Sequence, residues 1–73
     1  MKKVIYSSDH KLLIARLKKA RLDAGLDQLS AARGLGKSQS YISKIESGQR
    51  RVDIVQLKQF AKLYKKDLEF FLK

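Results

Sequence analysis

Apolar residues recur along this chain at spacings of three and four, which is the pattern of helices with one buried face. The pattern predicts a helix from Ser7 or Ser8 to about Ala24, then helices over 28–35 and 39–46. Two further helices are expected after Asp53 and Asp67. The inward-facing residues expected in these five helices are Leu13, Leu17, Ala20 and Ala24; Leu29, Ala32 and Leu35; Ile42 and Ile45; Ile54, Leu57, Phe60, Ala61 and Tyr64; and Leu68, Phe71 and Leu72.

Polar residues and glycine mark the ends of these segments. Asp27, Ser38, Asp53 and Asp67 each stand immediately before a predicted helix, where their side-chain oxygens can accept hydrogen bonds from free backbone N–H groups. Gly36 follows the second helix, where a left-handed residue often ends a helix and glycine adopts that conformation most easily. The helix boundaries are therefore predicted by capping residues as well as by apolar spacing.

Only about three residues separate the second and third helices, which is the length expected of a helix-turn-helix. Ala31 and Ala32 would allow the two helices to cross closely, with Ile42 and Ile45 packed against the second helix. The predicted fold is all-α, a compact five-helix bundle over 9–73 that contains this motif. Residues 1–8 include the β-forming Val4-Ile5-Tyr6 and are expected to form an N-terminal arm, an added edge strand or a loose end.

The outward face of the third helix carries polar residues that can hydrogen-bond to the edges of bases. Glutamine can bond adenine at two points, lysine can bond guanine, and serine accepts several partners. This pattern predicts a recognition helix that lies in the major groove of DNA and contacts bases through Gln39, Ser40, Ser43 and Lys44. The alternative is an ordinary solvated face, since every amphipathic helix has a polar side.

Composition favours the interpretation as a nucleic-acid-binding protein. The 73 residues contain 17 Lys and Arg against 7 Asp and Glu, a formal net charge of +10, which implies a polyanionic partner. Lys37, Arg50 and Arg51 are expected to neutralise DNA phosphates. The chain has no cysteine and a single histidine, His10, so a metal site, a cofactor and enzymatic acid–base chemistry are not expected. No apolar run is long enough to span a membrane, and a cytoplasmic location is the default expectation.

Glu46 stands at the end of the third helix, where a carboxylate opposes the helix dipole. A specific basic partner would explain it, and Arg21 on the inner side of the first helix is the candidate. The alternative is a surface carboxylate with no fixed partner.

Several of these residues together resemble the lambda-repressor-like (Cro/Xre) helix-turn-helix family. The resemblance rests on Gly25-Leu26-Asp27-Gln28, on Ala32 and Gly36, and on the continuous segment from Ser38 to Gly48. It extends over about residues 12–72 and implies a bundle of five helices that binds double-stranded DNA, usually as a dimer. It also implies a salt bridge between Arg21 and Glu46.

The resemblance assigns further roles residue by residue. Gln28 is implied to contact a phosphate, brace the recognition helix and bond Gln39. Phosphate contacts are also implied around the third helix, at Ser38, Tyr41 and Ser47. The chain departs from the family pattern at Lys37, at Ala31, for which Leu29 could compensate, and at Lys65 and Lys66, which replace the usual glycine and aliphatic residue.

The sequence thus predicts a DNA-binding transcriptional regulator, a homodimer on an inverted repeat with half-sites roughly 34 Å apart. Its dimer interface is expected where Phe70, Phe71 and Leu72 gather, although Phe70 could instead be partly buried within its own bundle. The alternative function is an antitoxin-type or other interaction module that binds a toxin or another protein as well as DNA.

Overall fold

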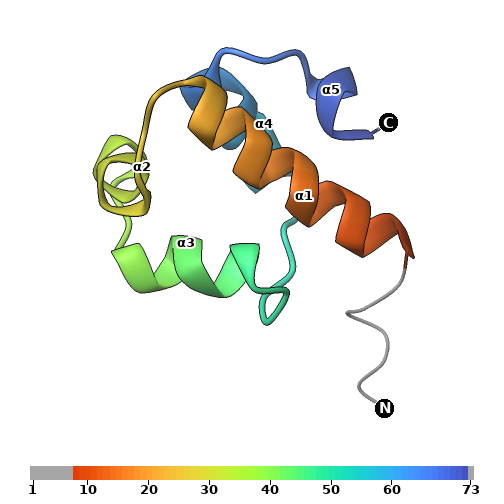
Figure 1. The fold of residues 1–73 in the computed structure, drawn as a ribbon, viewed down its shortest axis with the longest axis horizontal. Coiled ribbons are helices and arrows are strands. Elements are labelled where there is room, and N and C mark those ends of the chain that lie inside the picture. The colour runs from red at the N-terminus through yellow and green to blue at the C-terminus, as the bar shows by residue number, and fades with distance from the viewer. Residues whose placement is uncertain (1–7, 73) are drawn as a thin grey trace.

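The computed structural model describes residues 8–72 and confirms an all-α fold (Figure 1). The described part of the chain contains five helices: α1 (Ser8–Asp23), α2 (Gln28–Leu35), α3 (Gln39–Glu46), α4 (Ile54–Tyr64) and α5 (Leu68–Leu72). Helices α2 and α3 have the predicted boundaries, and α1 ends one residue before the predicted Ala24. Ser8 belongs to α1 rather than to an arm, and the arm or strand expected before it lies outside the described residues.

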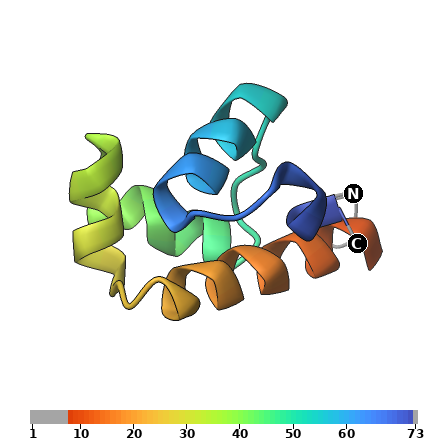
Figure 2. The ribbon, with the colours of Figure 1, turned by 90° about the horizontal axis from the view of Figure 1, so that it is seen from above.

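Helix α1 runs across the middle of the molecule, with α3 and α5 on opposite sides of it (Figure 1). Figure 2 shows α4 rising away from α1, with its N-terminal end the farther from α1. The buried side chains where these helices meet are Leu17, Ala20, Ala31, Ala32, Tyr41, Ile42, Ile45, Leu57, Phe60, Ala61, Tyr64 and Phe71. A single core therefore draws on all five helices.

The turn between α2 and α3 forms from local hydrogen bonds. Asp27 caps α2 by accepting a hydrogen bond from the Ser30 N–H at 2.7 Å, and Ser38 caps α3 through the Tyr41 N–H at 3.3 Å. Gly36 ends α2 in the left-handed region with φ 71°. The next N–H, that of Lys37, returns to the Ala32 carbonyl at 2.8 Å. These bonds fix the direction in which α3 leaves the turn.

Close approach of α2 to its neighbours depends on small residues. Ala31 and Ala32 are fully buried, as the crossing of the helices required. Gly34 lies against α4, because a Cβ atom added there would stand 2.8 Å from Leu63 Cδ1. Leu29 is 44% exposed, so the expectation that it compensates for the small Ala31 is wrong.

The end of α4 has the same geometry as the end of α2, but without glycine. Lys65 adopts the left-handed conformation with φ 57°. The Lys66 N–H then bonds the Ala61 carbonyl at 3.0 Å. At the other end of α4, Asp53 accepts a hydrogen bond from the Gln56 N–H while the Gln56 side chain accepts one from the Asp53 N–H, which completes a capping box.

Four residues predicted to face inward are exposed, and Leu29, described above, is one of them. Ala24 is exposed just beyond α1, and Ile54 and Leu72 are 54% and 63% exposed. Ile54 opens α4 at the end that stands away from α1 (Figure 2), and Leu72 lies in the last turn of α5. Each of these three residues has the correct helical spacing, but it sits at a helix end that the neighbouring helices do not cover.

The C-terminal residues expected at a dimer interface divide into three environments. Phe71 is 1% exposed and belongs to the core, so it is not available to a partner. Phe70 is half-buried, packed edge-on against Phe71 with ring centroids 5.3 Å apart. Leu72 is the one of the three that faces solvent broadly.

Candidate nucleic-acid interface

Helix α3 separates its apolar and polar residues onto two faces. Tyr41, Ile42 and Ile45 are buried, and the last two are each only 1% exposed. All four predicted base-contacting residues are exposed, as is Ser47 directly after the helix: the outward set is Gln39, Ser40, Ser43, Lys44 and Ser47. The structure therefore places the predicted base-contacting side chains together on one solvent-facing surface, which we call the α3 face.

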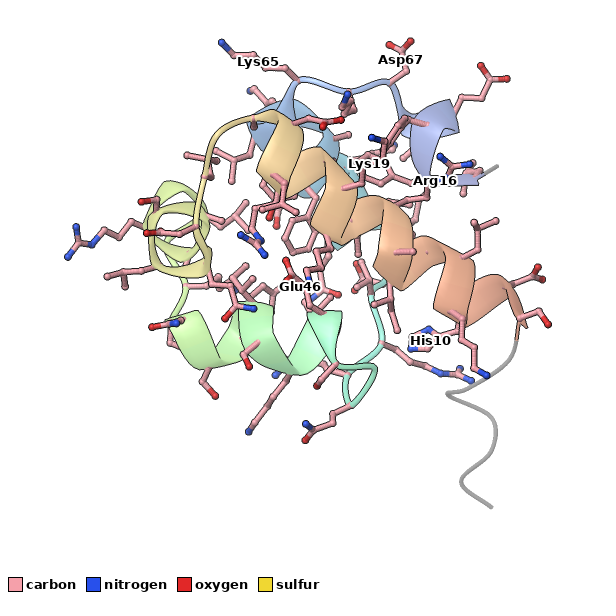
Figure 3. The ribbon with its side chains drawn as sticks, viewed as in Figure 1. His10, Arg16, Lys19, Glu46, Lys65 and Asp67 are labelled. Carbon is pink, nitrogen blue, oxygen red and sulfur yellow. The ribbon has the colours of Figure 1, made fainter. Side chains whose placement is uncertain are left out.

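A buried ion pair fixes α3 to α1. Arg21 Nε donates to Glu46 Oε2 at 2.7 Å, and its Nη2 donates to Oε1 at 3.0 Å. Both side chains are only 7% exposed, and Figure 3 shows Glu46 in the space between α3 and α1. The hydrogen bond to Glu46 raises the pKa of Arg21. The ion pair expected between these residues is present, and it does not depend on a flexible surface contact.

Two further groups complete the environment of this ion pair. Arg21 Nη1 donates to the Leu26 carbonyl at 2.9 Å, in the loop between α1 and α2. Gln28 Nε2 donates to Glu46 Oε1 at 3.2 Å, which joins the first residue of α2 to the last residue of α3. We call Arg21, Gln28 and Glu46 the α1–α3 brace. Gln28 thus braces the recognition helix through Glu46, and its bond with Gln39 remains a prediction.

The segment after α3 is also held in place. The Gln49 N–H bonds the Lys44 carbonyl at 2.9 Å. The Gln49 side chain donates to the Ser47 hydroxyl, which itself donates to the Lys44 carbonyl. These bonds close a turn at the C-terminal end of α3. Arg50 and Arg51 are both exposed and border one shallow hollow together with Asp53.

Tyr41 brings two of the predicted phosphate-binding residues together. Its ring stacks on that of Phe60, with centroids 6.3 Å apart and planes 9° apart. Lys37 Nζ and Arg50 Cζ lie 5.3 and 5.0 Å from the centroid of the same ring. Burial raises the pKa of Tyr41, while the nearby Arg50 and a hydrogen bond with Gln56 act in the opposite direction. Tyr41 itself is only 7% exposed.

Other kinds of site find little support in the described residues. No group of three or more His, Cys, Asp or Glu residues within 8–72 could hold a metal ion. No helix of that same stretch combines the length and the apolar character needed to cross a bilayer.

Some contributors to this interface were not predicted from the sequence. The Leu26 carbonyl and the Gln49 side chain have no distinctive sequence signal, because their roles follow from the folded path of two loops. Gln56 could have been found, since a glutamine three residues after an aspartate cap is the signature of a capping box. The joint approach of Lys37 and Arg50 to Tyr41 was also missed.

Comparison with known proteins agrees with this arrangement. A family model described as helix-turn-helix matches residues 17–71, which includes the C-terminal part of α1, all of α2, α3 and α4, and most of α5. The chain belongs to this family, the Cro/C1-type, lambda-repressor-like (Xre) helix-turn-helix proteins. It is a DNA-binding regulator of that type. No curated protein matches the sequence.

Proposed function

We propose that this protein is a sequence-specific transcriptional regulator that inserts α3 into the major groove of DNA. The observation that carries the proposal is the α3 face, whose exposed polar residues are set on a helix anchored from behind by the α1–α3 brace. Rigid placement matters because base-edge hydrogen bonds form only when donor and acceptor meet in the correct geometry. The buried inner side of α3 and the ion pair at its end supply that placement.

The chemistry of the α3 face suggests how bases are distinguished. Gln39 would make paired hydrogen bonds to adenine, and Lys44 would donate to the oxygen and nitrogen acceptors of guanine. Ser40 and Ser43 are short and exposed, so the backbone of α3 can approach the groove closely. Sequence preference would then depend mainly on the two long side chains.

Residues around the α3 face would contact the DNA backbone. Lys37, Arg50 and Arg51 supply positive charge, while Gln28, Ser38 and Ser47 supply hydrogen-bonding groups at the ends of α2 and α3. Phosphate contacts of this kind position a protein on the duplex without selecting a sequence. Binding should therefore weaken steeply with salt, by on the order of one log unit per log unit of salt for each phosphate neutralised.

We further propose that two copies bind an inverted repeat. One α3 face is small, and a second copy would double the number of base contacts on a symmetric operator. Because Phe71 is enclosed in its own core, the C-terminal contribution to such a dimer reduces to Leu72 and the exposed part of Phe70. Leu12, 37% exposed, borders the same hollow as Leu72 and would extend that apolar contact.

The test is selection of bound duplexes from a random DNA pool at near-physiological salt, with the Gln39→Ala variant as the control. We expect an enriched inverted repeat for the wild type, and loss of one base preference per half-site for the variant. Gln39→Ala should cost about 1–3 kcal/mol on the selected site only, whereas Arg51→Ala should weaken every duplex alike. Salt-sensitive binding without any enriched sequence would overturn the sequence-specific role.

A further inference from the structure

Tyr41 occupies a position that does not suit a direct phosphate ligand. Its side chain is 7% exposed, and one face of its ring is covered by Phe60, itself 2% exposed. Against the larger raising effect of burial, Gln56 on α4 lowers the pKa of the Tyr41 hydroxyl. The ring is thus held between α3 and α4. Its connection to DNA binding comes from the two cations that lie near it.

These cations come from opposite ends of α3. Lys37 precedes the Ser38 cap, and Arg50 follows the turn after the helix. Their charged groups lie 5.3 and 5.0 Å from the centroid of the Tyr41 ring, so they stand within about 10 Å of each other, the sum of those two distances. Thirteen positions apart in sequence, they share one aromatic ring.

Two cations this close repel each other, and long Lys and Arg side chains lose considerable rotamer freedom when they are fixed. The negative face of an aromatic ring offsets part of both costs, because it attracts a cation within about 6 Å of its centroid. A guanidinium that lies on a ring still has its in-plane N–H groups available for an anion. A phosphate group placed between the two cations would relieve their remaining repulsion.

We propose that Tyr41 is a positioning residue, an aromatic platform that holds Lys37 and Arg50 ready as a two-point clamp on the DNA backbone beside α3. The ring, and not the hydroxyl, carries this role. The inference rests on the proposed function, since the clamp needs DNA to act upon. It goes beyond that function because it makes two separate phosphate contacts depend on a third residue that does not touch the phosphate.

The same chain contains a matched control. Phe70 also carries two cations over its ring, with Arg16 Cζ at 5.4 Å and Lys66 Nζ at 4.7 Å. It belongs to α5, on the other side of α1 from α3 (Figure 1). Asp67 and Glu69 border the same hollow as Phe70, so the surroundings there are of mixed charge. Because Phe70 is also a proposed dimer contact, the control compares coupling and not affinity: the effect of Phe70→Leu on DNA binding should be the same whether Arg16 and Lys66 are present or both replaced by Gln.

The experiment measures affinity for one labelled random-sequence duplex as a function of salt, for wild type, Tyr41→Phe, Tyr41→Leu and Phe70→Leu. Tyr41→Phe keeps the ring and should bind like the wild type. Tyr41→Leu should weaken binding by roughly two- to five-fold for each cation released. The decisive comparison repeats Tyr41→Leu in the Lys37→Gln/Arg50→Gln background, where its effect should disappear because no cation remains to be positioned.

Each outcome either supports or overturns the platform. An equal loss for Tyr41→Phe would assign the role to the hydroxyl, and a Tyr41→Leu effect that persists without the two cations would show a merely structural role. Should Tyr41→Leu not fold, NMR of the wild type decides: ring-current shifts of the Lys37 and Arg50 side-chain protons must be present and must survive DNA addition. Wild type that binds no duplex would overturn the proposed function itself, whereas normal binding by a folded Tyr41→Leu overturns only the platform.

Discussion

The protein contains two helix junctions with the same backbone hydrogen bonds and different side chains. At the α2–α3 junction, the left-handed residue is Gly36, and the two helices that meet there are tied to α1 at their other ends by the buried ion pair of the α1–α3 brace. At the α4–α5 junction, the left-handed residue is Lys65, and the tie to α1 is the exposed pair of Lys66 Nζ and Asp23 Oδ2 at 3.1 Å. The junction that carries the α3 face is thus the one built from unstrained backbone and shielded charge.

The difference shows where precision matters in this fold. Left-handed backbone costs a side-chain-bearing residue on the order of 1–2 kcal/mol, and an exposed ion pair returns about 1 kcal/mol or less. The α4–α5 junction, which is remote from the α3 face, has both features. The junction beside the α3 face avoids both, because a shift in its geometry would move every base-contacting side chain together.

Breaking the brace should produce the largest effect. Glu46→Ala leaves the Arg21 guanidinium buried without its carboxylate, which typically costs about 3–5 kcal/mol. Chemical denaturation measures this loss. The double variant Arg21→Met/Glu46→Leu should lose clearly less than the single one, since no unpaired charge remains. A loss for Glu46→Ala below about 1 kcal/mol, the range of exposed pairs, would contradict the assigned burial.

The next largest effect should come from placing a side chain on the left-handed residue of the α2–α3 junction, as Lys65 does at the α4–α5 junction. Gly36→Ala should destabilise the fold by about 1 kcal/mol, because its φ of 71° disfavours a Cβ atom. No other atom lies within 4 Å of that Cβ position, so the loss reports backbone conformation alone. Gly36→Asn should lose less in the same thermal melts, because asparagine tolerates left-handed backbone better. Equal losses for both would refute this account.

The reverse change should improve the remote junction. Lys65→Gly removes the left-handed cost and adds the chain entropy of glycine, for a net stabilisation of about 0.5–1 kcal/mol. Lys62→Gly, within α4, is the control and should destabilise by about 1 kcal/mol. Denaturation midpoints of the two variants should therefore move in opposite directions, and a shared direction would exclude the conformational explanation.

The smallest expected effect is the pH dependence of the stability that the exposed ion pair between Lys66 and Asp23 contributes. The hydrogen bond from Lys66 lowers the pKa of Asp23 below its ordinary value, with a further contribution from Lys19. The contribution of Asp23 is therefore present at neutral pH and lost as acid protonates the carboxyl. The stability difference between wild type and Asp23→Asn should shrink between pH 7 and pH 3 in urea titrations, and should shrink with added salt as well. A difference that grows in acid would contradict the lowered pKa.

Local features of this fold were predicted well from the sequence, and features at the ends of its helices less well. Caps at Asp27, Ser38 and Asp53 depend on atoms within three residues, so spacing alone predicts them. Ile54 and Leu72 have the right periodicity, but periodicity does not show where the neighbouring helices stop covering a helix.

The candidate site shows the same division. The exposure of the predicted base-contacting residues follows from the helical pattern of α3, and the partnership of Arg21 with Glu46 follows from a carboxylate placed against the helix dipole. The arrangement around Tyr41 could not be predicted, because it needs Phe60 to fix the ring and the turn after α3 to return Arg50.

The length of α3 limits how much genetic information one copy can extract. Eight residues at about 1.5 Å each extend about 12 Å, which matches the rise of roughly four base pairs at 3.4 Å each. A word of four letters recurs by chance about once in 256 positions, while a genome offers about a million or more competing sites. Two such four-base sequences in an inverted repeat recur by chance about once in 65,000 positions. A helix of this size can therefore specify an operator only together with a second copy.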